Sequence, residues 1–363
     1  MVMTAPPRTA PAFSNSLTAG RLPRWAPWAI LFSSWALLSV VFVFVQMGTG
    51  ESFNIAGAIF FGTILFNILL FVLSQLVEGS RQARNRLVTS LVSTAFVIAL
   101  LPLISLVFTV LSNGLERFDL QYFSESMRNV VGEGGGAVHA IYGTLIVTGI
   151  ATLISVPVGL LAAIYLVEYG RGGLARAITF FVDVMTGIPS IVAGLFAYAF
   201  FSLILDDPGI RFGVGGSVAL SLLMIPVVVR SSEEMLKIVP NELREAAYAL
   251  GVPKWLTILK IVIPTAIAGI TTGVTLAIAR VIGETAPLLI IAGFTTSVNT
   301  DPFNERMMTL PVFVYTQYAN PGTQVDLYLD RAWAGALTLI LIAMVLNLAA
   351  RLISRIFSPK LGR

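Results

Sequence analysis

Long apolar runs separated by short charged loops constrain this chain more than any other feature of its sequence. A membrane-spanning helix needs about 20 mostly apolar residues, and lipid allows only helices or closed barrels to span it. Charged residues make up 12% of the 363 residues, against about 25% in soluble domains. The sequence therefore predicts an all-α membrane protein surrounded by lipid. About eight transmembrane helices are expected, at residues 28–46, 56–77, 88–111, 139–167, 178–205, 214–229, 262–293 and 333–357.

The distribution of lysine and arginine predicts how these helices are oriented. Most of the 23 basic residues fall in the N-terminal tail and in every second loop, including the longest loop, 230–261. An excess of lysine and arginine marks the cytoplasmic side of a membrane protein. We therefore expect a multi-pass protein with both termini in the cytoplasm. Residues 1–27 are expected to form a disordered basic tail, and residues 358–363 a short second tail.

Several kinds of chemistry are excluded by what the sequence lacks. No cysteine is present, which rules out disulfides and thiolate metal sites. The single histidine, His139, makes no metal site, and we expect it to be solvated at the end of a helix. No Gly-Lys pair occurs, so the glycine-rich stretch 132–136 is interpreted as a flexible hinge and not as a P-loop. No catalytic triad and no basic cluster with stacking aromatic residues occurs either, so we expect neither an enzyme nor a nucleic-acid-binding protein.

A short amphipathic helix is predicted within the longest cytoplasmic loop. Leu243, Ala246, Ala247 and Leu250 recur at helical spacing and form one apolar stripe, and Gly251 is placed to end the helix. The stripe is short and contains two alanines, which let another backbone come close. It suits a groove in a partner protein better than a layer of lipid headgroups. A helix lying on the membrane surface is the alternative.

The same loop resembles the EAA loop of ABC-importer permeases. The matching residues are Glu245, Ala246 and Ala247, followed by Gly251 and by IVIP at 261–264, where the family usually has leucine before the proline. The resemblance implies a coupling helix that docks into a groove on a separate ATPase subunit, with Glu245 among the contacting residues. ATP and Mg²⁺ would bind to that partner, and this chain would bind no cofactor.

Two charged residues, Arg280 and Glu284, lie inside one of the predicted transmembrane runs. At about 100° per residue, they share one narrow helix face with Gly269, Gly273 and Ala277. Small residues on one face mark helix–helix contacts in membranes. That face is expected to direct both charges into the helix bundle and away from lipid, where a bare arginine costs at least ~2.5–3.5 kcal/mol.

We interpret these two charges as part of a substrate pathway. The alternative is that Arg280 and Glu284 neutralise each other as a packing element. However, arginine before glutamate is the weaker order for a helical pair, and one carboxylate cannot occupy every donor of a guanidinium. Gly283 and Pro287 lie beside the pair and Pro189 interrupts another run, so helix breaks or hinges are expected there. Broken helices near the midplane are typical of transporter binding sites.

Three stretches resemble the PstA-type permeases of bacterial phosphate ABC importers. They are AIARVIGETAPLLIIAG (277–293), GTLIVTGIATLISVPVGLLAAIYLVEYG (143–170) and TGIPSIVAGLFAY (186–198). The resemblance extends over roughly 88–357 and implies a six-helix permease core there, in which the two charged residues help to move inorganic phosphate. Residues 28–87 would add an N-terminal transmembrane hairpin and a basic loop that the family pattern lacks.

The same resemblance implies a location and a set of partners. The location is a bacterial inner membrane. The partners are a homologous PstC-type permease, a PstB-type ATPase dimer and a PstS-type phosphate-binding protein, either periplasmic or lipid-anchored. Permeases for molybdate, sulfate or phosphonate are alternatives, because an Arg–Glu pair does not choose among anions. An ion-coupled secondary transporter would need no coupling helix, and the loop 240–264 argues against it.

Overall fold

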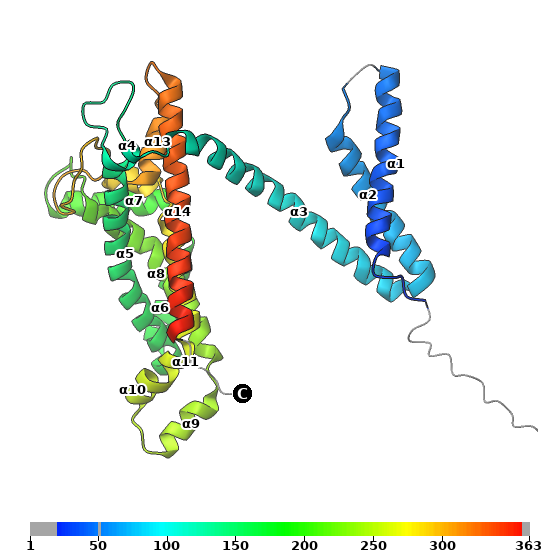
Figure 1. Ribbon diagram of the computed structural model, residues 1–363. Helices are drawn as coiled ribbons and strands as arrows, with labels where there is room; N and C mark the ends of the chain where they lie inside the picture. Colours follow the sequence, from blue (N-terminus) through cyan, green and yellow to red (C-terminus); the bar gives the residue numbers. More distant parts are fainter. Residues whose placement is uncertain (1–19, 50–51, 358–363) are drawn as a thin grey trace, which may run out of the picture. The chain divides into compact units, whose positions relative to one another are not determined.

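The computed structural model describes residues 20–49 and 52–357, which form helices and loops with no strand among them (Figure 1). The predicted tails at 1–27 and 358–363 lie outside the described residues, except for 20–27. The chain divides into an N-terminal unit, Met1–Leu106, and a C-terminal unit, Val107–Arg363. The helices are α1 (Ala26–Thr49), α2 (Ile55–Glu78), α3 (Ser80–Gly114), α4 (Leu120–Ser124), α5 (Val138–Ile164), α6 (Gly173–Thr186), α7 (Ser190–Ile204), α8 (Gly213–Ile238), α9 (Asn241–Ala249), α10 (Lys254–Thr257), α11 (Ile263–Val281), α12 (Ala286–Ile291), α13 (Leu310–Ala319) and α14 (Val325–Phe357).

Transmembrane helices occur where the sequence predicts them, with two differences in shape. Among the described residues, seven helices are long and apolar enough to cross a membrane, and eight candidate spans result when the pair α6–α7 counts as one. The run predicted at 178–205 is not one straight helix, because α6 and α7 meet at an angle of 111°. Pro189 lies in this break, where its missing N–H and fixed φ favour a new helix start over a continuous helix. The run predicted at 262–293 also stops early, since α11 ends at Val281.

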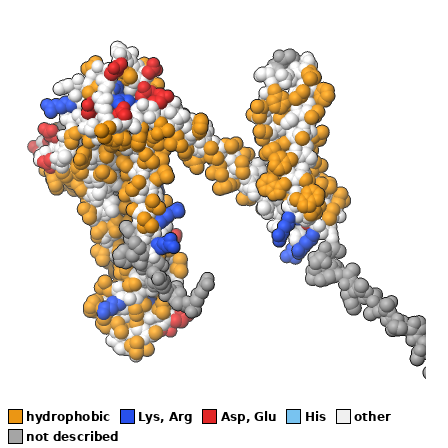
Figure 2. Space-filling view, viewed as in Figure 1, with side chains coloured by type: hydrophobic (Ala, Val, Ile, Leu, Met, Phe, Trp, Pro, Cys, Tyr) orange, Lys and Arg blue, Asp and Glu red, His pale blue; other side chains and the backbone are white. Residues whose placement is uncertain are grey.

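Polar contacts hold the N-terminal unit together. The indole N–H of Trp35 in α1 donates to Thr63 Oγ1 in α2 (3.1 Å). Glu78, at the end of α2, accepts from Arg86 Nε (2.6 Å) and from the backbone N–H of Leu22 (2.8 Å), so the chain before α1 lies against α2. Apolar side chains cover the outside of the unit, as expected for helices that face lipid (Figure 2).

Helix α8 lies at the centre of the C-terminal unit. In its most apolar stretch 67% of the residues are buried, against 33% or less in the other six long helices described. Glycines in the neighbouring helices α5 and α11 allow those helices to approach α8 closely. A methyl group on Gly159 of α5 would lie 2.7 Å from the Val228 side chain, and one on Gly273 of α11 would lie 2.5 Å from Ser231. Such close approach favours helix association in a membrane, where packing replaces the hydrophobic effect.

Candidate functional site

Arg280 lies in the last turn of α11, and Glu284 lies in the break that follows. The backbone N–H of Glu284 donates to Val281 O (3.1 Å) in the turn that ends the helix. The expectation that both charges share one helix face is therefore wrong. Pro287 has no N–H to donate and lies at the start of α12, so the chain starts a second short helix there instead of continuing the first.

The side chains of these two residues have no partner in the part of the chain that the structure describes. Arg280 is exposed and Glu284 is half-buried. Neither takes part in an ion pair or side-chain hydrogen bond with another described residue. Arg280 and Glu284 therefore do not form an ion pair with each other. The alternative that they neutralise each other as a packing element loses its main support.

The predicted stripe of small residues on α11 packs against α8. A methyl group on Gly269 would lie 2.2 Å from the Met235 side chain of α8, one on Gly273 would lie 2.5 Å from Ser231, and Ala277 is fully buried. Arg280 lies beyond the end of this contact and is exposed. The charge is thus not buried within this chain's own bundle, contrary to the prediction.

Two helix interruptions lie on segments that pack against each other. One is the α6–α7 break at Pro189, and the other is the α11–α12 break at Gly283. A methyl group on Gly194 of α7 would lie 2.5 Å from Pro287 Cα, so α7 packs directly on the start of α12. Segments far apart in sequence therefore meet just after Glu284, where α12 begins.

The predicted amphipathic helix in the loop 230–261 is α9, at the opposite end of the C-terminal unit from α4 (Figure 1). It starts directly after Pro240 and ends at Ala249. Gly251 has a φ of +75°, which L-residues rarely adopt, and it turns the chain away from the helix.

The exposed surface of α9 differs from the predicted stripe at one position. Glu245 and Ala246 are exposed, and Leu250 is 83% exposed. Ala247 is only 3% exposed and lies inside the chain. The expectation that Ala247 belongs to the free docking stripe is wrong, because that side of α9 covers the chain's own residues.

One largely buried ion pair was missed by the sequence analysis. Arg244 of α9 and Glu168, in a π-helical turn at the end of α5, pair at 2.8 Å, with side chains 12% and 5% exposed. Glu168 is the only acidic residue between 138 and 170. A lone acid at the end of an apolar helix was the signal available in the sequence.

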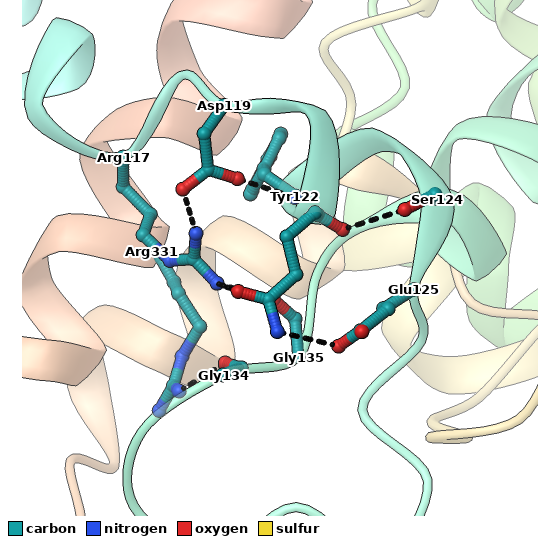
Figure 3. A network of polar contacts seen from close by, with 9 residues as sticks. Arg117, Asp119, Tyr122, Ser124, Glu125, Gly134, Gly135 and Arg331 are labelled. Atoms are coloured by element: carbon teal, nitrogen blue, oxygen red, sulfur yellow. Dashed lines mark hydrogen bonds and ion pairs between the residues drawn. The ribbon is translucent and has the colours of Figure 1, made fainter.

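A second cluster missed by the sequence analysis lies near α4 (Figure 3). Arg331 lies just before the run predicted at 333–357, yet it belongs to α14 and is 1% exposed. Its guanidinium donates to Gln317 Oε1 (3.1 Å) and to the carbonyls of Gly132 (2.8 Å) and Gly134 (3.1 Å). It also lies 4.6 Å from the centre of the Tyr328 ring.

Arg117 holds the same glycine-rich stretch at the neighbouring carbonyl (Figure 3). It donates to Gly135 O (2.8 Å) and pairs with Asp119, which in turn caps α4 by accepting from Tyr122 N (2.7 Å). With two arginines bonded to its carbonyls, the stretch 132–136 is a fixed structure and not the flexible hinge that was expected.

His139 also differs from expectation. It is 1% exposed instead of solvated, and its ring packs edge-on against Phe313 at 5.6 Å between centres. The residue therefore belongs to the packed core of the C-terminal unit.

Replacing Arg331 tests how firmly this cluster holds the fold. Arg331→Gln removes two bonds to glycine carbonyls, and hydrogen bonds from charged groups contribute ~1.5–3 kcal/mol each. We expect a free energy of unfolding lower by about 3 kcal/mol and a lower melting temperature of the purified protein in detergent. Arg128→Gln, which changes an exposed arginine of the same region, is the control. Equal melting temperatures for the two variants would contradict the assignment.

The chain matches a known protein family and individual known proteins. Residues 155–363 match the family "Binding-protein-dependent transport system inner membrane component". The chain is 47% identical over 276 residues to "Phosphate transport system permease protein PstA 1" of Mycobacterium tuberculosis (strain CDC 1551 / Oshkosh), covering 75% of this chain and 89% of that protein. It is 38% identical over 277 residues to "Phosphate transport system permease protein PstA" of Yersinia pestis, covering 76% and 92%.

Solved structures share the fold at low sequence identity. A subunit of a bacterial alginate ABC transporter, crystallised in complex with an alginate pentasaccharide-bound periplasmic protein, gives a TM-score of 0.55 at 17% identity and covers 77% of this chain and 97% of its own. The inward-facing MetNI methionine ABC transporter gives 0.51 at 20% identity, covering 61% and 96%. At these identities the likeness concerns the fold alone.

Proposed function

Because the chain belongs to the binding-protein-dependent transport permeases, and among them to the PstA-type phosphate permeases, we propose that it passes inorganic phosphate into the cell as the membrane subunit of an ATP-driven importer. The observation that carries the choice of phosphate is the 47% identity to a phosphate transport permease over 75% of this chain. The chain itself is a transport subunit and no enzyme, and ATP is hydrolysed on a separate subunit.

Arg280 and Glu284 are the residues we assign to the phosphate pathway. Arg280 is exposed in the last turn of a membrane-spanning helix, and no described side chain pairs with it. An arginine that faces lipid costs at least ~2.5–3.5 kcal/mol, so its guanidinium must face a partner chain or a polar passage. We assign Glu284 the role of a releasable counter-ion that competes for Arg280 and lets the anion leave; the alternative role is to hold Arg280 in position.

The helix breaks would allow the proposed phosphate pathway to change conformation. Gly283 and Pro287 separate α11 from α12, and Pro189 lies between α6 and α7. We assign hinge roles to all three residues. Discontinuous helices supply free backbone groups and helix ends at transporter binding sites.

Helix α9 is the surface that we assign to the ATPase. Glu245, Ala246 and the turn at Gly251 are free to contact a partner, whereas Ala247 supports the helix from inside. A PstB-type ATPase dimer would bind ATP and Mg²⁺ and would dock on α9. This chain needs no cofactor of its own.

The remaining partners follow from the same family. A PstC-type permease would complete the passage, and a PstS-type phosphate-binding protein, periplasmic or lipid-anchored, would deliver phosphate at the α4 end. The alginate transporter with its periplasmic protein offers a precedent for such an assembly on this fold. In this arrangement α9 and both termini lie in the cytoplasm of a multi-pass inner-membrane protein, with the core at 88–357 and the additional hairpin at 28–87.

Competition among anions tests the proposed substrate. Labelled phosphate uptake would be measured in vesicles that contain the full reconstituted complex, with molybdate, sulfate or a phosphonate added in excess. Unlabelled phosphate would be added in a parallel sample. We expect it to be the only one of these anions that suppresses the uptake. If one of the other oxyanions suppresses it equally well, the chain serves that anion class and the assignment to phosphate fails.

Deleting residues 1–80 tests whether the N-terminal hairpin takes part in transport. The deletion removes α1 and α2 together, so the remaining helices keep their orientation. We expect phosphate uptake to persist at a lower level, with the loss explained by the amount of protein in the membrane. Uptake and protein amount would be measured in the same cells. A truncated protein present at the normal level without uptake would contradict this expectation.

A further inference from the structure

The pair Glu168–Arg244 joins the proposed docking helix to two membrane-spanning helices. Arg244 donates through Nε to Glu168 Oε1 (3.0 Å) at the end of α5. It also donates to the carbonyls of Leu236 (3.0 Å) and Val239 (2.6 Å), where α8 ends. A single side chain of α9 is thus bonded to the ends of both α5 and α8.

Glu168 is fixed from a second direction. Lys254, the first residue of α10, donates to the backbone carbonyl of Glu168 and lies 4.7 Å from the centre of the Tyr169 ring. Both segments that flank the turn at Gly251 therefore contact the same π-helical turn, Tyr165–Tyr169.

Helix α5 continues from this turn to the other end of the C-terminal unit. With its π-helical turn it forms one helix of 32 residues, Val138–Tyr169. Near its start, Thr144 Oγ1 accepts from the backbone N–H of Leu310 (2.7 Å), the first residue of α13. A displacement of α9 that moves Glu168 would therefore reach α13 through one continuous helix.

Stability alone is a weak explanation for this ion pair. Desolvating two charges costs about as much as their attraction returns, and apolar residues of similar volume often serve a fold equally well. We propose that Glu168 and Arg244 are positioning residues through which movement of α9 is passed to α5. The inference rests on the proposed function, since it takes α9 as the site where the ATPase docks.

The test separates coupling from docking. Complexes would be reconstituted with Arg244→Gln, with Glu168→Gln and with both changes. Phosphate uptake, ATP hydrolysis and co-purification of the ATPase would be measured on each. Arg171→Gln, an exposed arginine close to the end of α5, is the matched control. Arg244→Lys keeps the charge but lacks the planar fork that bonds two carbonyls and a carboxylate at once.

We expect phosphate moved per ATP hydrolysed to fall at least about fivefold in both single variants, the lower end of typical coupling between sites. The double variant should lose no more than either single one, because all three break the same connection. The ATPase should still co-purify, Arg171→Gln should match the unmodified complex, and Arg244→Lys should recover part of the ratio.

Two results would overturn the inference. An unchanged ratio of phosphate to ATP in Arg244→Gln would show that the pair carries no coupling. Failure of the complex to assemble with both Arg244→Gln and Arg244→Lys would show that the pair only stabilises the fold. A failure of the proposed function itself is distinguishable, because then the unmodified complex would take up no phosphate.

Discussion

Arg280→Gln is expected to abolish phosphate uptake. Arg280 is the only basic residue between Lys260 and Arg306, so the substitution removes the only positive side chain in that part of the passage. Two charge-assisted hydrogen bonds to an anion, at ~1.5–3 kcal/mol each, correspond to a loss of at least about 100-fold. Uptake of labelled phosphate by the reconstituted complex measures this directly.

Two further variants show whether the loss of uptake is specific to the guanidinium of Arg280. Arg280→Lys should restore uptake only in part, because lysine offers a point charge where arginine offers a planar set of donors. Arg176→Gln, which changes an exposed arginine of α6, should leave uptake unchanged. Normal uptake by Arg280→Gln at a normal membrane level would remove Arg280 from the pathway.

Ala246→Asp is expected to abolish association with the ATPase while the permease stays in the membrane at its normal level. Ala246 is exposed on α9, so an aspartate there is solvated until a partner docks over it. Burying an unpaired carboxylate in that interface is then costly. Co-purification of the ATPase with the tagged permease measures the effect.

The neighbouring alanine provides the control. Ala247 is buried inside the chain, so Ala247→Asp places the same charge in the permease itself and should lower the amount of folded protein. If Ala246→Asp still co-purifies with the ATPase and transports phosphate normally, α9 is not the docking surface.

Features that depend on local sequence were predicted correctly. Apolar runs identify the membrane-spanning helices, because lipid requires every backbone polar group to bond within its own helix. The apolar spacing before Gly251 identifies α9, because helix periodicity and a glycine at the end are both local signals. The EAA pattern and the stretch 277–293 identify the family in the same way.

Two kinds of feature could not be predicted: whether a helix bends or ends at a proline, and which distant segments contact each other. The helical face drawn through Arg280 and Glu284 assumes one continuous helix, and a sequence does not show whether a proline bends a helix or ends it. Ala247 is buried by segments that fold against α9. The burial of Arg331 requires the glycine carbonyls at 132 and 134, which lie far from it in sequence.

Uptake of labelled phosphate into vesicles that contain the complete reconstituted complex tests the central claim most directly. The phosphate-binding protein would be supplied outside and ATP inside, and a parallel sample would have an imposed ion gradient and no ATP. We expect phosphate to accumulate only with ATP, in amounts that follow its hydrolysis. Accumulation driven by the ion gradient alone, or ATP hydrolysis that moves no phosphate, would contradict the account.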